Sequence, residues 1–287
     1  MKKRLTVLLA LTFVLVGTLA LAGCSSSSSD ISDTSSENNS DDVLIVGMEC
    51  DYAPYNWTTT TENDYTVPIS DADFADGYDV ALAQKIADGL GQELEVKPIS
   101  WEGLIPALQN KEIDLIIAGM TDTEERREAV SFTEPYYESE MVVVVAKDSA
   151  YANATDIQEF SGAQVIGQAN TIYDEVIDQI DGVEHMAAQT SFSRMILSVS
   201  SGEADALVGE LPAAKGAIAA NSDLMIIRFE DGHGFEADTS VSIAVNKDNS
   251  DLEEQVNDIL EGISTEDREA MMEAAIERQP SSEEATE

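Results

Sequence analysis

The sequence predicts an α/β protein with two lobes, and three observations lead to this prediction. The chain has 287 residues, which is more than one average domain. Apolar strand-like runs alternate with amphipathic helical segments over roughly 230 residues, the pattern of mostly parallel sheets covered by helices. This pattern occurs twice, with breaks near Ala146 and Gly234. We therefore expect residues 43–140 to form lobe 1, residues 141–236 to form lobe 2, and residues 237–279 to return to lobe 1.

The first 23 residues are typical of an export signal. Residues 2–4 are basic, and an apolar run covers residues 5–20, which is the usual order in such signals. The following Leu-Ala-Gly-Cys24 resembles the lipobox of bacterial lipoproteins, in which the cysteine becomes the lipid-modified amino terminus. A signal-anchor helix that stays in the membrane is the alternative. We expect Cys24 to carry fatty acyl chains such as palmitate and to anchor the protein on the extracytoplasmic face of the cell membrane.

Two polar segments flank the predicted lobes. Residues 24–42 are predicted to be a flexible linker, because after Cys24 they contain nine Ser, five acidic and no basic residues. Such a composition cannot bury a core. Residues 280–287 are predicted to be a polar tail.

The charge composition excludes one class of partner. The chain has 56 acidic and 15 basic residues and a formal net charge of −41. Binding to nucleic-acid phosphates depends on clustered Lys and Arg, so we expect no nucleic-acid partner. The acidic charge favours solubility and does not indicate the charge of a ligand.

The two cysteines, Cys24 and Cys50, predict neither a disulfide nor a metal site. If Cys24 is lipidated, Cys50 has no cysteine to pair with, and thiolate metal sites need several ligands. Cys50 is predicted to be a small packed residue at the end of a strand. We expect no cofactor and no metal.

Hydrophobic periodicity predicts the elements of lobe 1 in order. Residue Gly91 is a typical helix stop, and it follows a clear amphipathic pattern. The polar, β-poor composition of residues 58–76 predicts an insertion or a surface loop. The remaining predicted elements are strands at 43–48, 94–99, 115–118 and 141–146, a helix at 80–90, and a helix that begins at residue 101.

In lobe 2 the same alternation predicts a short helix or turn at 155–160, and then further strands and helices. The strands are predicted at 164–168, 184–189, 205–210 and 224–229, and the helices at 172–180, 191–200 and 211–220. A strand at 240–246 and helices at 251–263 and 265–278 are predicted to follow and to pack on lobe 1.

One turn combines several features of a ligand site. The apolar run 115–118 predicts a strand buried on both faces, and small ligands bind at the carboxyl edge of such sheets. Gly119 follows at that edge, and residues 121–124 form a capping-box pattern. Arg126 comes next, and an arginine can hold a carboxylate with two parallel hydrogen bonds. The alternative is that Arg126 pairs with Asp122 on a solvated helix face.

A second candidate region follows the first strand. Tyr52, Tyr55 and Trp57 surround Pro54 just after the expected strand end. Aromatic rings with polar groups suit ligand walls, but they also pack in ordinary cores, and both interpretations fit this pattern.

The chain resembles the solute-binding proteins of the polar amino-acid ABC transporter family, also called the family 3 extracellular solute-binding proteins. The resemblance covers about residues 43–278. It implies a two-lobed type II periplasmic-binding-protein fold with two hinge crossings, and a function in which the lobes capture one free amino acid. A membrane permease and an ATPase of an ABC importer would then be the partners. The motifs that carry it lie at residues 51–55, 77–80, 101–108, 114–121, 123–126 and 132–136.

By this resemblance, four residues hold the α-carboxylate of the ligand. Arg126 corresponds to the arginine that clamps the carboxylate, and Thr121 to the hydroxyl that assists it. Gly119 corresponds to a strand end that supplies backbone. Thr171, at the start of a helix in lobe 2, corresponds to the group that meets the same carboxylate from the other side.

The rest of the ligand is implied to meet four other residues. Glu210 corresponds to the carboxylate that receives the α-ammonium, although the family usually has Asp there; a buried carboxylate can also cap a helix. Tyr52 and Trp101 correspond to the rings on either side of the ligand side chain, and Glu49 lies near the far end of that pocket. Ala118 replaces a position that is often Ser.

Two rival functions remain open at this stage. One is a dehydratase-type enzyme on the same fold, for which a histidine or tuned carboxylate is needed in the cleft. His185 and His233 lie in no matched motif, so we expect no enzyme. The other is a surface lipoprotein that senses an amino acid. We expect a monomer in either case.

Overall fold

The computed structural model describes residues 42–280. The predicted export signal, Cys24, nearly all of the linker and most of the polar tail lie outside the described residues. Within residues 42–280, no helix is both long enough and apolar enough to cross a membrane.

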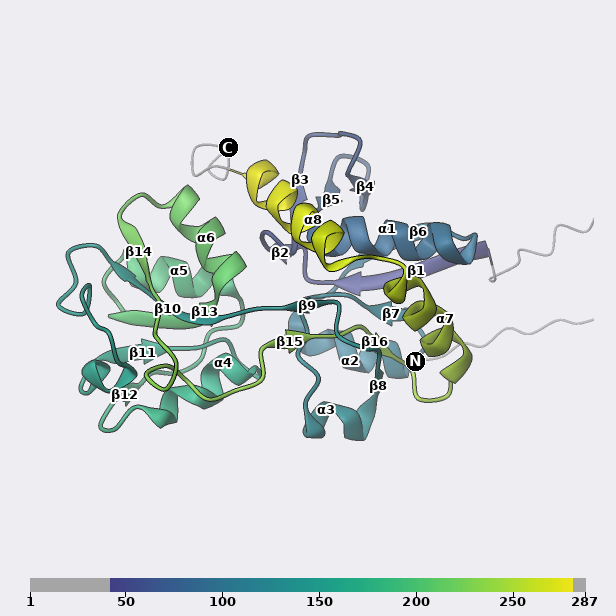
Figure 1. The fold of residues 1–287 in the computed structure, drawn as a ribbon. Coiled ribbons are helices and arrows are strands. Elements are labelled where there is room, and N and C mark those ends of the chain that lie inside the picture. The colour runs from purple at the N-terminus through teal and green to yellow at the C-terminus, as the bar shows by residue number, and fades with distance from the viewer. Residues whose placement is uncertain (1–41, 281–287) are drawn as a thin grey trace, which may run out of the picture. The chain divides into compact units, whose positions relative to one another are not determined.

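Lobe 1 is built on a five-stranded sheet with the order β6-β1-β7-β16-β8 (Figure 1). Strand β1 pairs in parallel with β6 and β7. Strand β16 comes from the end of the chain and pairs antiparallel with β7 and β8. The strands are β1 (Val43–Met48), β6 (Glu93–Pro98), β7 (Leu115–Ile116), β8 (Ser131–Phe132) and β16 (Ala244–Val245).

Helices cover this sheet because they carry apolar faces at helical spacing. Helix α1 buries Val80, Ala83 and Ala87 and ends where Gly91 adopts a left-handed conformation, with φ 72°, as glycine permits. Helices α1 and α2 lie on opposite sides of β1 in Figure 1, and α7 and α8 pack against α1. Their bounds are α1 (Tyr78–Leu90), α2 (Trp101–Gln109), α3 (Glu124–Ala129), α7 (Ser250–Glu261) and α8 (Thr265–Arg278).

The prediction of a surface loop at residues 58–76 is wrong. This segment contributes to a small antiparallel sheet with the order β2-β3-β5-β4. Its strands are too short and polar to show a hydrophobic period, but the buried side chains of Trp57, Val67 and Ala75 fasten it to lobe 1. The strands are β2 (Asp51–Tyr52), β3 (Asn56–Thr59), β4 (Val67–Pro68) and β5 (Phe74–Asp76).

Lobe 2 is built on a second five-stranded sheet with the order β12-β11-β13-β10-β14. Strand β11 pairs in parallel with β12 and β13, whereas β10 pairs antiparallel with β13 and β14. The strands are β10 (Met141–Ala146), β11 (Gln164–Ile166), β12 (Glu184–His185), β13 (Ala206–Glu210) and β14 (Leu224–Ile227). The prediction of mostly parallel sheets is therefore wrong, because β10 and β16, which enter from the connections between the lobes, each pair antiparallel with both neighbours.

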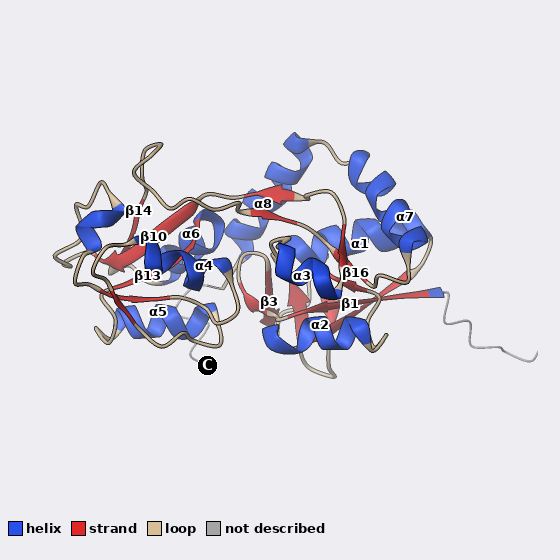
Figure 2. Cartoon of the chain, turned by 90° about the horizontal axis from the view of Figure 1, so that it is seen from below, coloured by secondary structure: helices blue, strands red, loops and turns tan. Residues whose placement is uncertain are grey.

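The helices of lobe 2 include α5 and α6, which lie near strands β10 and β13 (Figure 2). The helix expected at residues 172–180 is divided into one α-helical turn and one 3₁₀ turn. The elements are the 3₁₀ turn η2 (Ile157–Phe160), α4 (Ile172–Glu175), the 3₁₀ turn η3 (Val176–Gln179), α5 (Phe192–Ser200) and α6 (Leu211–Ala220).

The chain passes between the two sheets twice. Strands β9 (Tyr137–Glu138) and β15 (Ser240–Val241) pair antiparallel, and they lie between the sheets in Figure 1. Strand β9 leads into β10 of lobe 2, and β15 leads into β16 of lobe 1. Two crossing strands of this kind are a common arrangement for a hinge.

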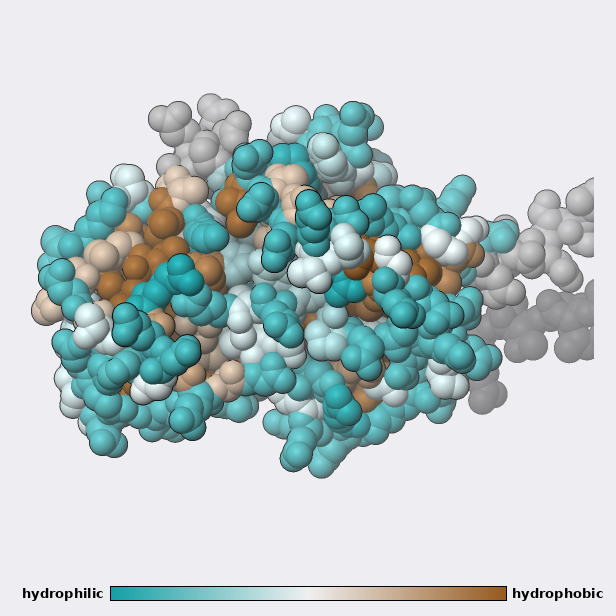
Figure 3. Space-filling view, viewed as in Figure 1, coloured by the Kyte–Doolittle hydropathy of each residue, from teal (hydrophilic) through white to brown (hydrophobic). Residues whose placement is uncertain are grey.

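Hydrophilic residues cover most of the face shown in Figure 3, in keeping with the acidic composition. Among residues 42–280, the large hydrophobic side chains that stand exposed are Tyr65 and Leu197. Single exposed apolar residues are normal on protein surfaces. The buried apolar side chains form two clusters, and partly buried apolar residues pack against them.

Candidate functional site

Arg126 lies where the two lobes meet. Its Nη1 donates a hydrogen bond of 2.5 Å to the Thr121 carbonyl in lobe 1, and its Nη2 donates one of 2.9 Å to the Asn170 carbonyl in lobe 2. The guanidinium carbon lies 5.1 Å from the centre of the Trp101 ring, within the range of a cation–π contact. Carbonyl oxygens and a ring hold the guanidinium in place without neutralising its charge.

The alternative pairing of Arg126 with Asp122 does not form. Asp122 binds Arg127 instead, with 2.6 Å between Arg127 Nε and Asp122 Oδ1. In the described part of the chain, no carboxylate oxygen lies within 4.0 Å of the Arg126 guanidinium. Burial lowers the pKa of Arg126, and Glu175 is the acidic neighbour that raises it most. An arginine nevertheless stays protonated, so the site contains a partly buried cation that has no ion-pair partner within 4.0 Å among the described residues.

The helix start at this turn differs from the predicted capping box. Thr123, not Thr121, is the N-cap of α3, and its hydroxyl accepts a hydrogen bond of 3.2 Å from the Arg126 amide. Thr121 is buried and its backbone pairs with Val241 of the crossing strand β15. The prediction is wrong by two residues because a threonine stands at both positions. The Thr123 cap fixes the backbone of Arg126 directly.

Glu210 ends strand β13 in lobe 2 and is fully buried. Its Oε1 accepts a hydrogen bond from the Tyr52 hydroxyl, and its Oε2 accepts one of 2.6 Å from the Tyr55 hydroxyl. Both tyrosines belong to lobe 1. The side chain does not cap helix α6, so the helix-cap alternative is not seen.

Glu210, like Arg126, is an ionisable side chain that lacks an ion-pair partner among the described residues. Burial raises the pKa of Glu210, and hydrogen bonds from Tyr52 and Tyr55 lower it in part. Within residues 42–280, no Lys, Arg or His nitrogen lies within 4.0 Å of its carboxylate. A buried carboxylate whose only hydrogen-bond donors are hydroxyls gains strongly from a nearby cation.

Gly119 supports the site through a chain of hydrogen bonds. Its amide donates to the Tyr136 hydroxyl at 2.9 Å, and that hydroxyl donates to Asp79 Oδ1 at 2.9 Å. Burial raises the pKa of Asp79 to about 7. Gly119 has φ 59°, and a Cβ there would lie 3.1 Å from the Tyr52 ring. A ligand that is expected to bind the Gly119 amide would therefore have to replace the Tyr136 hydroxyl as its hydrogen-bond acceptor.

Thr171 and Trp101 flank Arg126 from opposite lobes. Thr171 is buried and begins the one-turn helix α4, but its hydroxyl donates to the Gln168 carbonyl at 2.7 Å rather than capping an amide. Trp101 Nε1 donates to the Asn170 carbonyl at 3.2 Å. The same carbonyl thus binds Trp101 and Arg126, and it brings lobe 2 against lobe 1.

Tyr52 lies beside Glu210 rather than beside Arg126. Its ring stacks on Tyr55 with centres 5.3 Å apart, and its edge meets Phe192 of lobe 2. The two rings that were predicted to enclose the ligand side chain therefore lie beside different groups. Trp101 lies beside Arg126, and Tyr52 lies beside Glu210.

Glu49 lies next to Gln168 of lobe 2, whose Nε2 is 3.4 Å from Oε1 of Glu49. Burial raises the pKa of Glu49 to about 7; the Gln168 contact lowers it and Asp51 raises it. Glu49 also borders a hollow of about 1090 Å³, which is lined from both lobes and by the end of α8. A carboxylate at this position can receive a cationic group that extends through the cleft.

A model of the bacterial extracellular solute-binding proteins, family 3, matches residues 44–274. The chain belongs to this family. The resemblance found in the sequence motifs is thereby confirmed.

Known members of family 3 are similar over most of the chain. The arginine-binding extracellular protein ArtP of Bacillus subtilis is 30% identical over 262 residues, which cover 91% of this chain and 92% of that protein. A structure of arginine-bound ArgBP from T. maritima has a TM-score of 0.66 at 33% identity and covers 78% of this chain and 97% of that one. The substrate-binding protein AbpA of Streptococcus pneumoniae, bound to L-arginine, has a TM-score of 0.70 at 25% identity and covers 82% and 95%.

These likenesses confirm the predicted two-lobed α/β fold of the periplasmic-binding-protein type. The roles of the individual residues stay predictions. The structure brings Arg126, Thr121 and Trp101 together against the Asn170 carbonyl, which is next to Thr171 in the chain, and it groups Glu210 with Tyr52, beside Gly119. Glu49 lies at the edge of the large hollow.

Sequence reasoning missed three hydroxyl groups around Glu210. Tyr55 was singled out only as an aromatic near Pro54, and its hydrogen bond to Glu210 crosses 155 positions of sequence. Tyr173 and Ser139 also contribute to the pKa of Glu210. No local pattern predicts these contacts, since they depend on how the lobes meet. The family motif around Tyr55 is the one signal that could have indicated it.

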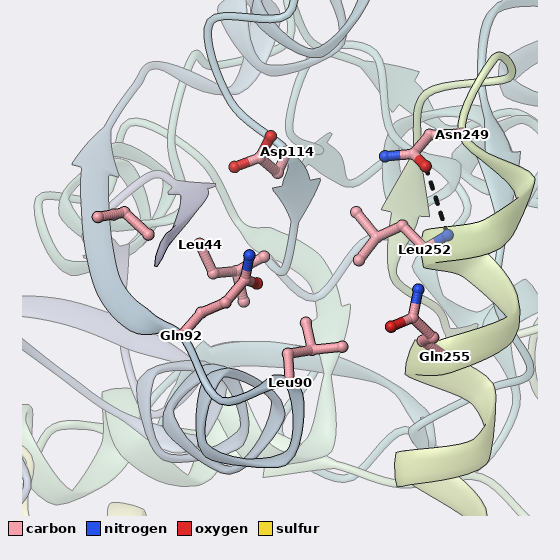
Figure 4. Close-up of a pocket in the computed structure, with 8 residues that line it drawn as sticks. Leu44, Leu90, Gln92, Asp114, Asn249, Leu252 and Gln255 are labelled. Carbon is pink, nitrogen blue, oxygen red and sulfur yellow. Dashed lines mark hydrogen bonds between the residues drawn. The ribbon is translucent and has the colours of Figure 1, made fainter. Parts of the chain in front are cut away.

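Two other features lie apart from this site. A hollow of about 270 Å³ at the amino end of β1 is lined by Leu44, Asp114 and Leu252 among others (Figure 4), where Asn249 Oδ1 accepts the Leu252 amide. Ligands of such sheets bind at the opposite, carboxyl edge.

The two histidines form ion pairs elsewhere: His185 binds Asp174 and Asp178, and His233 binds Asp156. Residues 42–280 contain no cluster of metal-ligating side chains.

Proposed function

We propose that the protein captures a free α-amino acid between its lobes and delivers it to the membrane permease of an ABC importer. The observation that carries this proposal is a pair of unneutralised charges. Arg126 and Glu210 have opposite charges, extend from different lobes, and have no ion-pair partner within 4.0 Å among the described residues.

An α-amino acid is complementary to these two groups. Its carboxylate can accept hydrogen bonds from Arg126, which has five N–H donors and gives two of them to backbone carbonyls. Its ammonium can offer Glu210 the positive charge that the tyrosine hydroxyls lack. Unpaired charges are costly in a buried site, so a ligand that neutralises both gains affinity from each. Charge-assisted hydrogen bonds also give selectivity for zwitterions.

For the side chain we propose a cationic amino acid, with L-arginine as the first candidate. Glu49 supports this class, because it is a largely buried carboxylate that contacts Gln168 of the other lobe and borders the large hollow. The relatives above that are named for arginine support the same class. A guanidinium or ammonium would pair with Glu49 and draw its pKa down from about 7.

Capture by this mechanism needs no chemical step. Contacts from both lobes exist only when the lobes meet, so a ligand that touches Arg126, Thr171 and Glu210 favours that arrangement. We propose that the protein is not an enzyme. His185 and His233 support this, since both bind surface carboxylates.

We also propose that Cys24 is lipidated and that the protein acts as a monomer tethered to the outer surface of the cell membrane. The lipobox-like sequence and the Ser-rich linker that follows support the tether. Metabolic labelling with a palmitate analogue tests it: wild-type protein should incorporate label, and Cys24→Ala should not. Size-exclusion chromatography with light scattering tests the monomer.

Isothermal titration of the protein lacking residues 1–24 tests the main proposal against a panel of free amino acids. We expect saturable binding of L-arginine, weaker binding of L-lysine, and no binding of L-glutamate. Agmatine, which lacks the α-carboxylate, should not bind. The absence of binding for every amino acid in the panel would overturn the proposal.

A further inference from the structure

The hydroxyl of Tyr173 is buried and feels both charges of the proposed site. Tyr173 lies in α4, two residues after Thr171, and is 7% exposed. Burial raises the pKa of Tyr173 far above its usual value; Glu210 raises it further and Arg126 lowers it. The phenol is therefore within electrostatic range of both groups, and it stays protonated at neutral pH.

This hydroxyl has no hydrogen-bond partner among the described residues. It is close enough to Glu210 to favour the ionised carboxylate, but the contact is longer or more bent than a normal hydrogen bond. The hydroxyl of Ser139 is also buried beside Glu210 without a partner. Because buried hydroxyls are nearly always hydrogen-bonded, this pair forms a polar surface that is suited to a ligand group.

The other tyrosines around Glu210 are used differently. Tyr52 and Tyr55 come from lobe 1 and donate their protons to the two carboxylate oxygens. Tyr173 belongs to the same lobe as Glu210, and the oxygen of its hydroxyl is free to accept. An ammonium group has three N–H donors, and a carboxylate that already receives two hydroxyls is poorly placed to accept all of them.

We infer that the Tyr173 hydroxyl contacts the ligand, accepts one N–H of its α-ammonium, and makes the site selective for primary over N-methylated α-amino groups. This inference rests on the proposed function. Tyr173 would donate its own proton toward Glu210 and accept from the ammonium, so that a hydroxyl without a partner becomes fully hydrogen-bonded only in the complex.

The ammonium is favoured over the ligand carboxylate as the group that Tyr173 meets. After burial, the electrostatic effect and hydrogen-bond contact of Glu210 are the main influences on this phenol, ahead of Arg126. Tyr173 thus contacts the Glu210 side chain, whereas Arg126 acts on it only through its charge, and the ammonium is the ligand group expected at Glu210.

The test compares two ligands on two variants by isothermal titration. L-Arginine and Nα-methyl-L-arginine are titrated into wild type and Tyr173→Phe. Wild type should bind L-arginine at least about tenfold more tightly than its methylated analogue. Tyr173→Phe should lose about tenfold in affinity for L-arginine, the usual effect of removing a hydrogen bond to a charged group. It should bind the methylated ligand nearly as wild type does, so that the ratio falls toward one.

Tyr55→Phe is the matched control, because it removes the same atom from a tyrosine that already donates to Glu210. It should weaken both ligands by a similar factor and keep the wild-type ratio. An unchanged ratio in Tyr173→Phe, or a wild type that binds both ligands equally, would overturn the inference while leaving the proposed function intact. If wild type binds no free amino acid, the proposed function itself fails. If it prefers another amino acid, that amino acid and its Nα-methyl derivative replace the arginine pair.

Discussion

The hydroxyl of Tyr52 in lobe 1 donates a hydrogen bond to the buried carboxylate of Glu210 in lobe 2. Tyr55 adds a second hydrogen bond between the same lobes. The carboxylate that is proposed to receive the ligand ammonium therefore also connects the lobes. Ligand recognition and lobe contact depend on the same buried side chain.

Glu210→Gln should separate binding from stability. The raised pKa of Glu210 means that the folded protein disfavours its charge, so a neutral isostere should leave the melting temperature unchanged or raise it by a few degrees. The ligand-induced rise in melting temperature should disappear, because the ammonium loses its counter-charge. Scanning calorimetry at pH 8 with and without 10 mM L-arginine measures both, with the exposed Glu134→Gln as the control. A variant that arginine still stabilises fully would contradict the role of Glu210.

Alanine substitutions of the adjacent Arg126 and Arg127 should have very different effects on the affinity for L-arginine. Arg126→Ala should weaken L-arginine binding by at least about thirtyfold, since removing one partner of a desolvated charge pair costs about 2–5 kcal/mol. Arg127→Ala should change the affinity less than about threefold, because its side chain is 65% exposed and pairs with Asp122 on the surface. Isothermal titration of both variants decides this. Equal losses in the two variants would show that the Arg126 contact is not with the ligand.

Glu49 should make the affinity for a cationic ligand depend on pH. Its pKa of about 7 leaves it mostly neutral at pH 5.5 and mostly ionised at pH 8, and only the ionised form attracts a cation. The affinity for L-arginine should therefore rise by about an order of magnitude over this range. L-Citrulline, which is neutral at its end, should show a smaller rise. In Glu49→Gln the two ligands should have parallel pH profiles; a steeper profile for arginine in that variant would rule out Glu49 as the source.

Gly119→Ala and Gly91→Ala form a matched pair for the role of the Gly119 turn. Both glycines have positive φ, but a Cβ at position 91 has nothing within 4 Å, whereas one at position 119 meets the Tyr52 ring. Each substitution should lower the free energy of unfolding by about 1 kcal/mol through backbone strain, measured with urea. Gly119→Ala alone should also weaken ligand binding, because it displaces Tyr52 from Glu210. Intact affinity in Gly119→Ala would mean that Tyr52 does not need its present position.

The sequence predicts those parts of the structure that depend on local chemistry. The helix that ends at Gly91 and the buried strand that begins at Leu115 lie where the periodicity indicates. Arg126 lies at the junction of the lobes because a buried strand, a glycine and a threonine cap direct it there. The capping register was wrong by two residues, since the hydroxyl of either threonine satisfies the same pattern.

What the sequence did not predict depends on contacts between distant segments. The strands within residues 58–76 bury a few side chains, Val67 and Ala75, and show no alternation along the chain. The tyrosines around Glu210 come from positions 52, 55 and 173, and only the meeting of two lobes brings them together. The use of the Gly119 amide by Tyr136 is of the same kind.

Burial raises the pKa of the Cys50 thiol to about 12, and the side chain is 5% exposed. A protein that begins after Cys24 therefore keeps a single native thiol, which maleimide dyes would not reach at neutral pH. One cysteine placed at the exposed Leu197 of α5 could then be labelled on its own. Fluorescence from that dye would report ligand-driven movement of lobe 2 without removal of the native cysteine.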